Sequence, residues 1–142
     1  MNTATAHPNL FDNTLNSLRP LMDLAGRLGL STIFALAALN KIQYYDANAQ
    51  FMASGGIPAA LLPLVIAFEL IGAVFIAIGF QTRLTALAFA GFSVITALLY
   101  HNQLGDQVQF LLFFKNIAMA GGFLVLAANG AGTLSIDARR LN

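Results

Sequence analysis

The feature that most constrains this chain is the wide spacing of its charged residues, which leaves long stretches without any charge. Only 9% of its 142 residues are Asp, Glu, Lys or Arg, whereas soluble domains carry about 25%. The stretch between Asp46 and Glu69 holds 22 uncharged residues, and none is charged between Lys115 and Asp137. A helix of about 20 apolar residues crosses the ~30 Å hydrocarbon layer of a membrane. We therefore expect an integral membrane protein.

Four stretches are long and apolar enough for such helices, and they predict an all-α membrane protein, a four-helix transmembrane bundle. The spans are expected at Asp23–Tyr45, Pro58–Phe80, Leu84–Tyr100 and Gln107–Ala128. A membrane β-barrel is not expected, because its strands alternate polar and apolar residues and these stretches do not. The bundle accounts for residues 21–137, with residues 138–142 as a short C-terminal tail.

Residues 1–20 form a separate N-terminal segment in this prediction, and it lacks the features of a cleavable signal peptide. Within residues 9–18, four apolar residues fall near one helical face: Leu10, Phe11, Leu15 and Leu18. This pattern is typical of a short amphipathic helix that lies on the membrane surface. A frayed polar tail is the alternative, and it stays open. Pro20 is expected to break the chain before the first span.

The basic residues predict the orientation of the bundle. Five of the seven Lys and Arg residues fall on one side of the four-span topology: Arg19, Arg27, Arg83, Arg139 and Arg140. Because basic residues are enriched on the cytoplasmic side, both termini are expected in the cytoplasm. The loops at residues 46–57 and 101–106 are then expected outside. At the inner end, three residues are expected to form a structural ionic cluster: Asp23, Arg27 and Arg83.

Two ionisable residues are expected deep in the membrane. Glu69 lies near the middle of the second span, where a carboxylate costs roughly 2.5–3.5 kcal/mol on insertion scales. Lys115 lies in the fourth span, and the depths of the two residues differ by about three residues, or roughly 4–5 Å. We expect both side chains to face the bundle interior and to neutralise each other, directly or through water. The alternative is that the pair only fixes the packing of the helices.

Other polar residues gather in the same outer half of the bundle, and with this pair they predict a cavity that opens to the outside. The candidate ligand-binding residues are Asn40, Lys41, Glu69, Tyr100, His101, Lys115 and Asn116. Such a cavity can hydrogen-bond a carbonyl or hydroxyl group while apolar side chains hold a hydrophobic body. Each of these residues also has an interpretation that requires no ligand. Lys41 can anchor its helix at the membrane interface, and His101 can be exposed to water at the end of a helix.

The composition argues against several classes of function for this chain. The sequence has no cysteine, so it supplies no disulfide, thiolate nucleophile, iron–sulfur ligand or cysteine zinc ligand. Its two histidines are far apart in sequence, and no metal site is expected. The formal net charge is +1, which provides no basic field for nucleic acid.

Several short motifs carry a resemblance to a known family. They are ALNKI (Ala38–Ile42), SGGIP (Ser54–Pro58), the mid-span Glu69, GFQTR (Gly79–Arg83) and GAGTLSID (Gly130–Asp137). In their order and spacing, from about Gly26 to Asp137, the chain resembles the DoxX family of small four-span bacterial membrane proteins. The resemblance implies a compact bundle in the bacterial inner (cytoplasmic) membrane, in contact with the lipid bilayer. It also implies recurring polar positions at Lys41, Glu69, Arg83 and His101.

The resemblance and the polar residues together give a leading hypothesis: a component of a redox or oxidative-stress system that binds quinone or a small aromatic molecule. Lys41 or Lys115 would hydrogen-bond a quinone oxygen, and Glu69 and His101 would be catalytic groups that exchange the accompanying protons. No covalent cofactor is expected, and a flavin would be held only by a partner subunit. Whether the protein is an enzyme, as a quinone-linked oxidoreductase subunit, stays open.

Two alternatives to this hypothesis belong to other functional classes. One is a non-catalytic assembly factor or structural subunit of a membrane complex, in which the small-residue helix faces recruit the larger partner. The other is a small transporter, which would need a homo-oligomer because four spans form a narrow scaffold. Both alternatives stay open at the level of the sequence.

Overall fold

The computed structural model describes residues 10–140, and in this range the chain is helical and contains no strand. The helices are α1 (Leu10–Gln43), α2 (Tyr45–Ser54), the 3-10 turn η1 (Ala59–Leu61), α3 (Leu62–Ile78), α4 (Thr82–Tyr100), α5 (Gln107–Asn129) and α6 (Ile136–Arg140). Four helical segments are long and apolar enough to cross a membrane: α1, η1 with α3, α4 and α5. The predicted all-α, four-helix membrane bundle is therefore confirmed.

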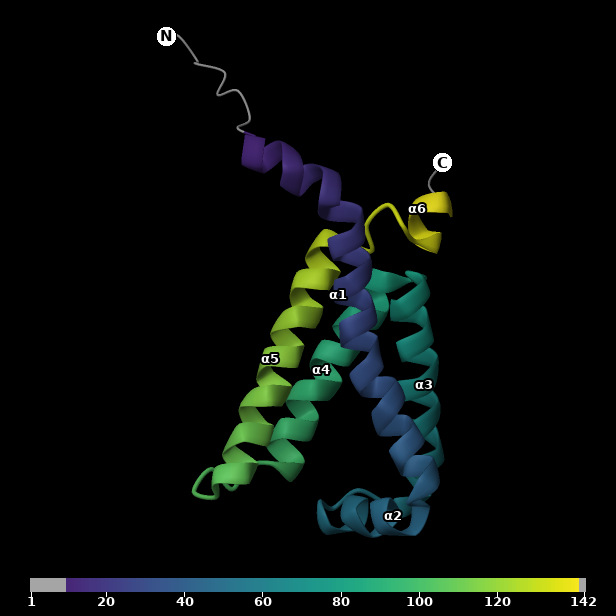
Figure 1. The fold of residues 1–142 in the computed structure, drawn as a ribbon. Helices are drawn as coiled ribbons and strands as arrows, with labels where there is room; N and C mark the ends of the chain where they lie inside the picture. The colour runs from purple at the N-terminus through teal and green to yellow at the C-terminus, as the bar shows by residue number, and fades with distance from the viewer. Residues whose placement is uncertain (1–9, 141–142) are drawn as a thin grey trace.

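The spanning helices form two pairs. α1 packs mainly on α3, and α4 packs mainly on α5. Figure 1 shows that the two pairs diverge toward the end of the bundle at which α2 lies, while the start of α1 and α6 lie at the opposite end. We call these the outer and inner ends, following the predicted orientation, which remains a prediction. Large apolar side chains such as Leu64, Leu84 and Val125 are exposed on the helices, as expected for contact with lipid.

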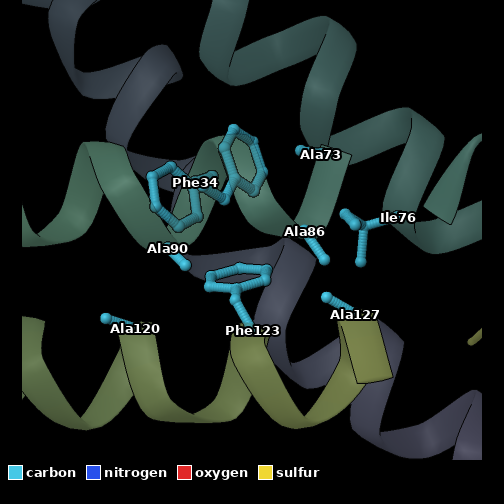
Figure 2. Packing of buried hydrophobic residues seen from close by; sticks show 9 residues of the cluster. Phe34, Ala73, Ile76, Ala86, Ala90, Ala120, Phe123 and Ala127 are labelled. Carbon is cyan, nitrogen blue, oxygen red and sulfur yellow. The ribbon is translucent and has the colours of Figure 1, made fainter. Parts of the chain in front are cut away.

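The two pairs are held together by an aromatic cluster surrounded by small residues (Figure 2). The ring of Phe34 from α1 stacks on Phe89 from α4, with a centroid distance of 4.0 Å. Phe123 from α5 packs edge-on against both rings, at 5.5 and 5.3 Å. The small residues let the helices approach closely, which is how membrane helices gain packing contacts. Gly72 on α3 is one such residue, because a Cβ at this position would overlap the ring of Phe89.

The expected break at Pro20 is wrong, because Pro20 lies inside α1 and the helix continues on both sides of it. A proline removes one backbone hydrogen bond, and helices tolerate this loss as a kink. In Figure 1 the first turns of α1 lean away from the rest of the bundle. With 34 residues, α1 is about 51 Å long, which exceeds the ~30 Å hydrocarbon layer. Its first turns therefore extend beyond the layer; whether they lie on the membrane surface remains a prediction.

The outer segment at residues 46–57 was expected to be a loop, but most of it is the helix α2, which crosses the outer end of the bundle (Figure 1). Phe51 on α2 stacks on Tyr100 at the end of α4, with a centroid distance of 4.9 Å. Gly55 then passes against the same tyrosine ring, where a Cβ would overlap it. Gly56 turns the chain with a φ of 79°, which favours glycine. The SGGIP motif thus ends α2 and seats it against α4.

The inner end is held by arginines that bind helix carbonyls. Arg27 is only 1% exposed, and its guanidinium donates to the carbonyls of Ile76 and Ala77 at the end of α3, at 3.3 and 3.1 Å, and to Leu134. Arg83 donates in the same way to the last carbonyls of α5, at 2.9–3.1 Å. Cations stabilise helix C-termini because these carbonyls have no partner within the helix.

The predicted ionic cluster of Asp23, Arg27 and Arg83 does not form through direct ion pairs, although Asp23 lies near enough to Arg27 to interact with its charge. Within residues 10–140, neither Arg27 nor Arg83 makes an ion pair, and Asp23 instead lies 4.0 Å from Arg19 on the same helix. The physical reason is that carbonyls at the ends of α3 and α5 lie closer to the guanidinium groups than any carboxylate does. These arginines hold helix ends in place through hydrogen bonds to the backbone.

A carboxylate supplies the matching contact at the start of α4. Asp137 accepts hydrogen bonds from the backbone N–H groups of Gln81 and Thr82, at 2.8 and 2.9 Å, and its own N–H donates to the carbonyl of Gly79. No side chain next to α4 in sequence caps its first turn, so Asp137 performs the role of an N-cap from a distant part of the chain. The GFQTR and GAGTLSID motifs meet at this point.

Candidate ligand-binding site

A cavity of about 340 Å³ lies in the outer half of the bundle, between the two helix pairs and beside α2. Every spanning helix contributes to its lining. Its walls are mostly apolar and include Phe34, Phe51, Met52, Val65, Phe92 and Met119. This volume is at the lower end of the range for small-molecule sites, which are also mostly apolar with a few polar groups. The predicted outer-half cavity is therefore present as a space that a small molecule can enter.

The main polar feature of the cavity is an ion pair between α1 and α3. The ammonium nitrogen of Lys41 lies 2.8 and 2.9 Å from the two carboxylate oxygens of Glu69. The side chain of Glu69 is 2% exposed and that of Lys41 is 20% exposed. A charge removed from water in this way requires both a counter-charge and hydrogen bonds, and Lys41 supplies both.

The partner of Glu69 was predicted to be Lys115, and the direct pairing of these two residues is wrong. Glu69 lies on α3, which packs along α1, and this places Lys41 next to it. Lys115 lies on α5, which packs on α4 and belongs to the other pair of helices. The similar depth of Glu69 and Lys115 describes their position along the membrane normal. It does not determine which helices are neighbours. The interpretation of Lys41 as an interfacial anchor is corrected by the same contact.

Lys115 lines the same cavity as the ion pair. Its side chain is exposed, and in the part of the chain that the structure describes it has no hydrogen-bond or ion-pair partner. The expectation that both side chains face the bundle interior agrees with the burial of Glu69, and for the exposed Lys115 it stays a prediction. The cavity therefore contains one neutralised ammonium group and one that is not neutralised.

The other predicted ligand-binding residues have different surroundings. Tyr100, His101 and Asn116 line the cavity, whereas Asn40 does not. Asn40 is exposed, and its amide oxygen lies 3.5 Å from the side-chain nitrogen of Asn48 at the junction of α1 and α2. Asn116 is buried and already hydrogen-bonded, to the carbonyl of Leu112 and to the hydroxyl of Thr96 on α4.

His101 has a defined partner at the outer end of α4. Its Nδ1 lies 2.8 Å from the side-chain oxygen of Gln109. An amide oxygen only accepts hydrogen bonds, so Nδ1 is the donor in this contact. The contact ties the outer end of α4 to α5, and His101 also lines the cavity.

The sequence analysis missed the residues that α2 brings to the cavity, namely Asn48, Phe51 and Met52. They were missed because the segment was interpreted as an exposed loop. One signal was available: two glycines directly follow Ser54, and glycine just after a short run of helix-compatible residues is a typical helix stop. Thr96 on α4 was missed as well, because a single threonine in an apolar span carries no distinctive pattern.

The chemistry available in the cavity is that of hydrogen bonding and charge. In residues 10–140, no group of three or more His, Asp or Glu residues lies close enough together to hold a metal ion. The polar residues of the lining are two lysines, one glutamate, one tyrosine, one histidine, one threonine and two asparagines. Such a set can orient a molecule that has a polar oxygen and an apolar body.

The fold and the cavity define the class of this protein: a small four-span helical membrane protein with an internal cavity in one half of the bundle. The chain belongs to the DoxX family, whose sequence model matches residues 22–102. It is 44% identical over 119 residues to the inner membrane protein YqjF of Escherichia coli K12, which covers 84% of this chain and 91% of YqjF. It is also 36% identical over 128 residues to the inner membrane protein YphA of the same organism, with 85% and 91% covered.

No solved structure matches the chain. The relatives and the four spanning helices together show an integral, multi-pass protein of the inner membrane, as the sequence predicted. The residues that the family model matches include Lys41, Glu69, Arg83 and His101. Lys115 lies beyond that match, on α5.

Proposed function

We propose that this DoxX-family protein binds quinone, or another small aromatic molecule, in the outer-half cavity and serves a redox or oxidative-stress system of the inner membrane. The observation that carries the proposal is the cavity itself, which combines aromatic walls with an ammonium group that no residue in the described part of the chain neutralises. Apolar walls with a few convergent polar groups are typical of sites for small molecules.

The geometry supports a specific arrangement of such a ligand. The rings of Phe34 and Phe92 are 6.1 Å apart and line the cavity, so they offer faces and edges for packing against a second aromatic ring. Lys115 would donate a hydrogen bond to a ligand oxygen, and Nε2 of His101 would accept one from a hydroxyl group. Glu69 would act mainly on Lys41, which it holds in place through two hydrogen bonds.

In a redox role, the residues of this chain would handle protons rather than electrons. His101 and Glu69 are the groups in the cavity whose charge state can change by gaining a proton, as general acid–base groups do. The electrons would come from a donor outside this chain, because the sequence contains no cysteine and the described residues form no metal-binding cluster. This role therefore requires an electron donor outside this chain.

A substitution that fills the cavity tests the proposal. Ala37 lines the cavity, whereas Ala88 on α4 is exposed and does not. We expect the purified protein in nanodiscs to bind a short-chain ubiquinone, and Ala37→Phe to weaken this binding at least about tenfold because the new ring takes up ligand space. Isothermal titration calorimetry measures the affinity, and thermal unfolding checks that the variant is folded.

Ala88→Phe is the matched control, since it adds the same ring outside the cavity. Its affinity for the quinone should equal that of the wild type. Equal binding by wild type and Ala37→Phe would place the ligand elsewhere, and no binding by the wild type would contradict the proposal. The second result would favour the alternative of a non-catalytic subunit.

A further inference from the structure

We infer that the cavity selects an aromatic oxyanion, a small aromatic molecule carrying one negatively charged oxygen group, over a neutral molecule of the same shape. The inference rests on the proposed function, because it assigns the class of ligand to the same cavity. It follows from the balance of charges around the space and not from the cavity volume.

The charged and titratable groups that line the cavity come from four elements. Lys41 lies on α1, Glu69 on α3, Tyr100 and His101 at the end of α4, and Lys115 on α5. α2 contributes Asn48 but no titratable side chain. Glu69 is bound by Lys41 through both carboxylate oxygens, so this pair adds no net charge. Two lysines and one carboxylate therefore line the cavity, and the excess positive charge belongs to Lys115.

The other acidic residues near the outer end do not compensate this charge. Asp106 does not line the cavity, and its carboxylate accepts a hydrogen bond of 2.8 Å from the N–H of Gln109 in the first turn of α5. Asp46 is exposed in the first turn of α2 and is not part of the lining. An ammonium group at membrane depth is costly without a counter-charge. A ligand with a negative oxygen would supply one, together with a short charge-assisted hydrogen bond.

The remaining walls favour a flat, apolar body attached to this oxyanion. Phe34 and Phe92 line the inner part of the cavity, and the stacked rings of Phe51 and Tyr100 lie on its outer side. Aromatic rings pack well against the faces and edges of other rings. A phenolate or a benzoate combines both requirements, a charged oxygen for Lys115 and a ring for these four residues.

The test compares two molecules that differ in charge but not in shape, 4-butylbenzoate and 4-butylbenzamide. At pH 7 the acid is ionised, because carboxylic acids have pKa values near 4, and the amide is neutral. We expect wild-type protein in nanodiscs of neutral lipid to bind the benzoate at least about tenfold more tightly than the benzamide. In Lys115→Met this preference should disappear, because the benzoate loses a charge-assisted hydrogen bond, whereas the benzamide loses only a weaker one to its carbonyl oxygen.

Two further variants separate charge from other effects. Lys115→Arg keeps the positive charge and should keep the preference for the benzoate. Arg139→Met removes a cation from the inner end of the chain and should leave the preference unchanged. Lys115→Gln serves as a second neutral variant if Lys115→Met does not fold, which thermal unfolding would reveal.

The outcomes distinguish this inference from the proposed function. Equal binding of benzoate and benzamide by the wild type, with both lost in Ala37→Phe, overturns the oxyanion preference and leaves the cavity as a site for neutral aromatic ligands. A preference that persists in Lys115→Met also overturns the inference, because its source is then another group. Binding of none of the three probes, the quinone included, overturns both proposals.

Discussion

Glu69 is the residue at which burial and charge conflict most directly. It lies in the middle of an apolar helix and is almost completely buried, so its ionised form depends on a partner. Lys41 is that partner, and it joins α1 to α3 on one side of the cavity. Buried ion pairs of this kind often contribute little net stability, but removing one member leaves an uncompensated charge.

This asymmetry gives a prediction for variants of the pair. Glu69→Gln should destabilise the protein by about 3 kcal/mol, because Lys41 is then left without its counter-charge. Lys41→Met should have an effect of similar size for the converse reason. The double variant should be more stable than the sum of the single effects implies, since no unpaired charge remains. Unfolding of the purified protein in detergent, followed by circular dichroism, measures the four free energies.

The same cycle also bears on ligand binding. Glu69→Gln is expected to weaken quinone binding, because the position of Lys41 is lost with its partner. Strictly additive free energies in the cycle would contradict the pairing of Lys41 with Glu69. Unchanged quinone affinity and turnover in Glu69→Gln would remove this carboxylate from the functional site.

At this scale the sequence predicted which residues are unusual but not how they pair. A carboxylate and an ammonium group inside apolar stretches stand out because each is costly in a membrane. The choice between Lys41 and Lys115 as the partner of Glu69 depends on which helix packs beside α3, and the depth of a residue holds no information about this. The capping roles of Arg27 and Arg83 were missed for a related reason, because their partners are backbone carbonyls and have no signature in the sequence.

At the scale of the elements, the segment after α5 fixes the start of α4. The link runs through Asp137, whose carboxylate binds two backbone N–H groups of the α3–α4 turn. Partial burial acts to raise the pKa of Asp137, but the hydrogen bonds from Thr82 and Gln81 and the nearby charge of Arg140 outweigh it and hold the pKa below its usual value. The ionised carboxylate is therefore the form that the folded protein prefers.

Removing this carboxylate should loosen the first turn of α4. Asp137→Ala is expected to reduce stability locally by about 1 kcal/mol, as the loss of an N-cap does. Hydrogen exchange measured by mass spectrometry should become faster in a peptide covering residues 79–86. Asp46→Ala, at the other end of the bundle, is the control and should leave this peptide unchanged. Equal exchange in Asp137→Ala and wild type would contradict the capping role.

The contribution of Asp137 should also depend on pH, with a sign fixed by its lowered pKa. The contribution is complete above the pKa of an unfolded Asp, about 3.9, because the carboxylate is then ionised in both states. It is lost as the pH falls below this value and through the lower pKa of the folded protein. The difference in protection between wild type and Asp137→Ala should be constant from about pH 5 to 8 and shrink below about pH 4.

The four spanning helices were largely predictable, because an uncharged apolar stretch of about 20 residues is typical of a transmembrane helix. The errors concern the places where the chain leaves the membrane. Pro20 was expected to break the chain before the first span, yet one lost hydrogen bond does not outweigh the continuity of a helix this long. α2 was missed because ten residues of mixed polarity form a stable helix only through tertiary contacts, here those of Phe51 with Tyr100.

For the whole molecule, the orientation in the membrane is a direct prediction from the basic residues. The sequence has no cysteine, so single cysteines can report on each side without a background. We expect Gln103→Cys, in the turn between α4 and α5, to react with a membrane-impermeant maleimide in intact spheroplasts. Thr133→Cys, near α6, should react only after lysis. The reverse pattern of labelling would show that the positive-inside rule fails for this bundle.

The cavity could be predicted only in part. Polar residues at similar depth on different spans indicated that some of them meet in the outer half. The shape of the space depends on how far the two helix pairs diverge and on the position of α2, and both are set by side-chain packing around Phe34, Phe89 and Phe123. Packing of this kind depends on contacts between distant parts of the chain, which no local pattern records.

The placement of the two lysines on different helix pairs has a consequence for how such proteins can diverge or be engineered. The neutralised lysine belongs to the framework and ties α1 to α3, whereas Lys115 has no protein partner in residues 10–140 and sits on α5. Exchanging this one side chain for Glu, Gln or Leu should redirect the bundle toward cationic, polar or purely hydrocarbon guests with little cost to folding. The ligand selectivity of this bundle can thus change through substitutions at position 115 while the fold stays the same.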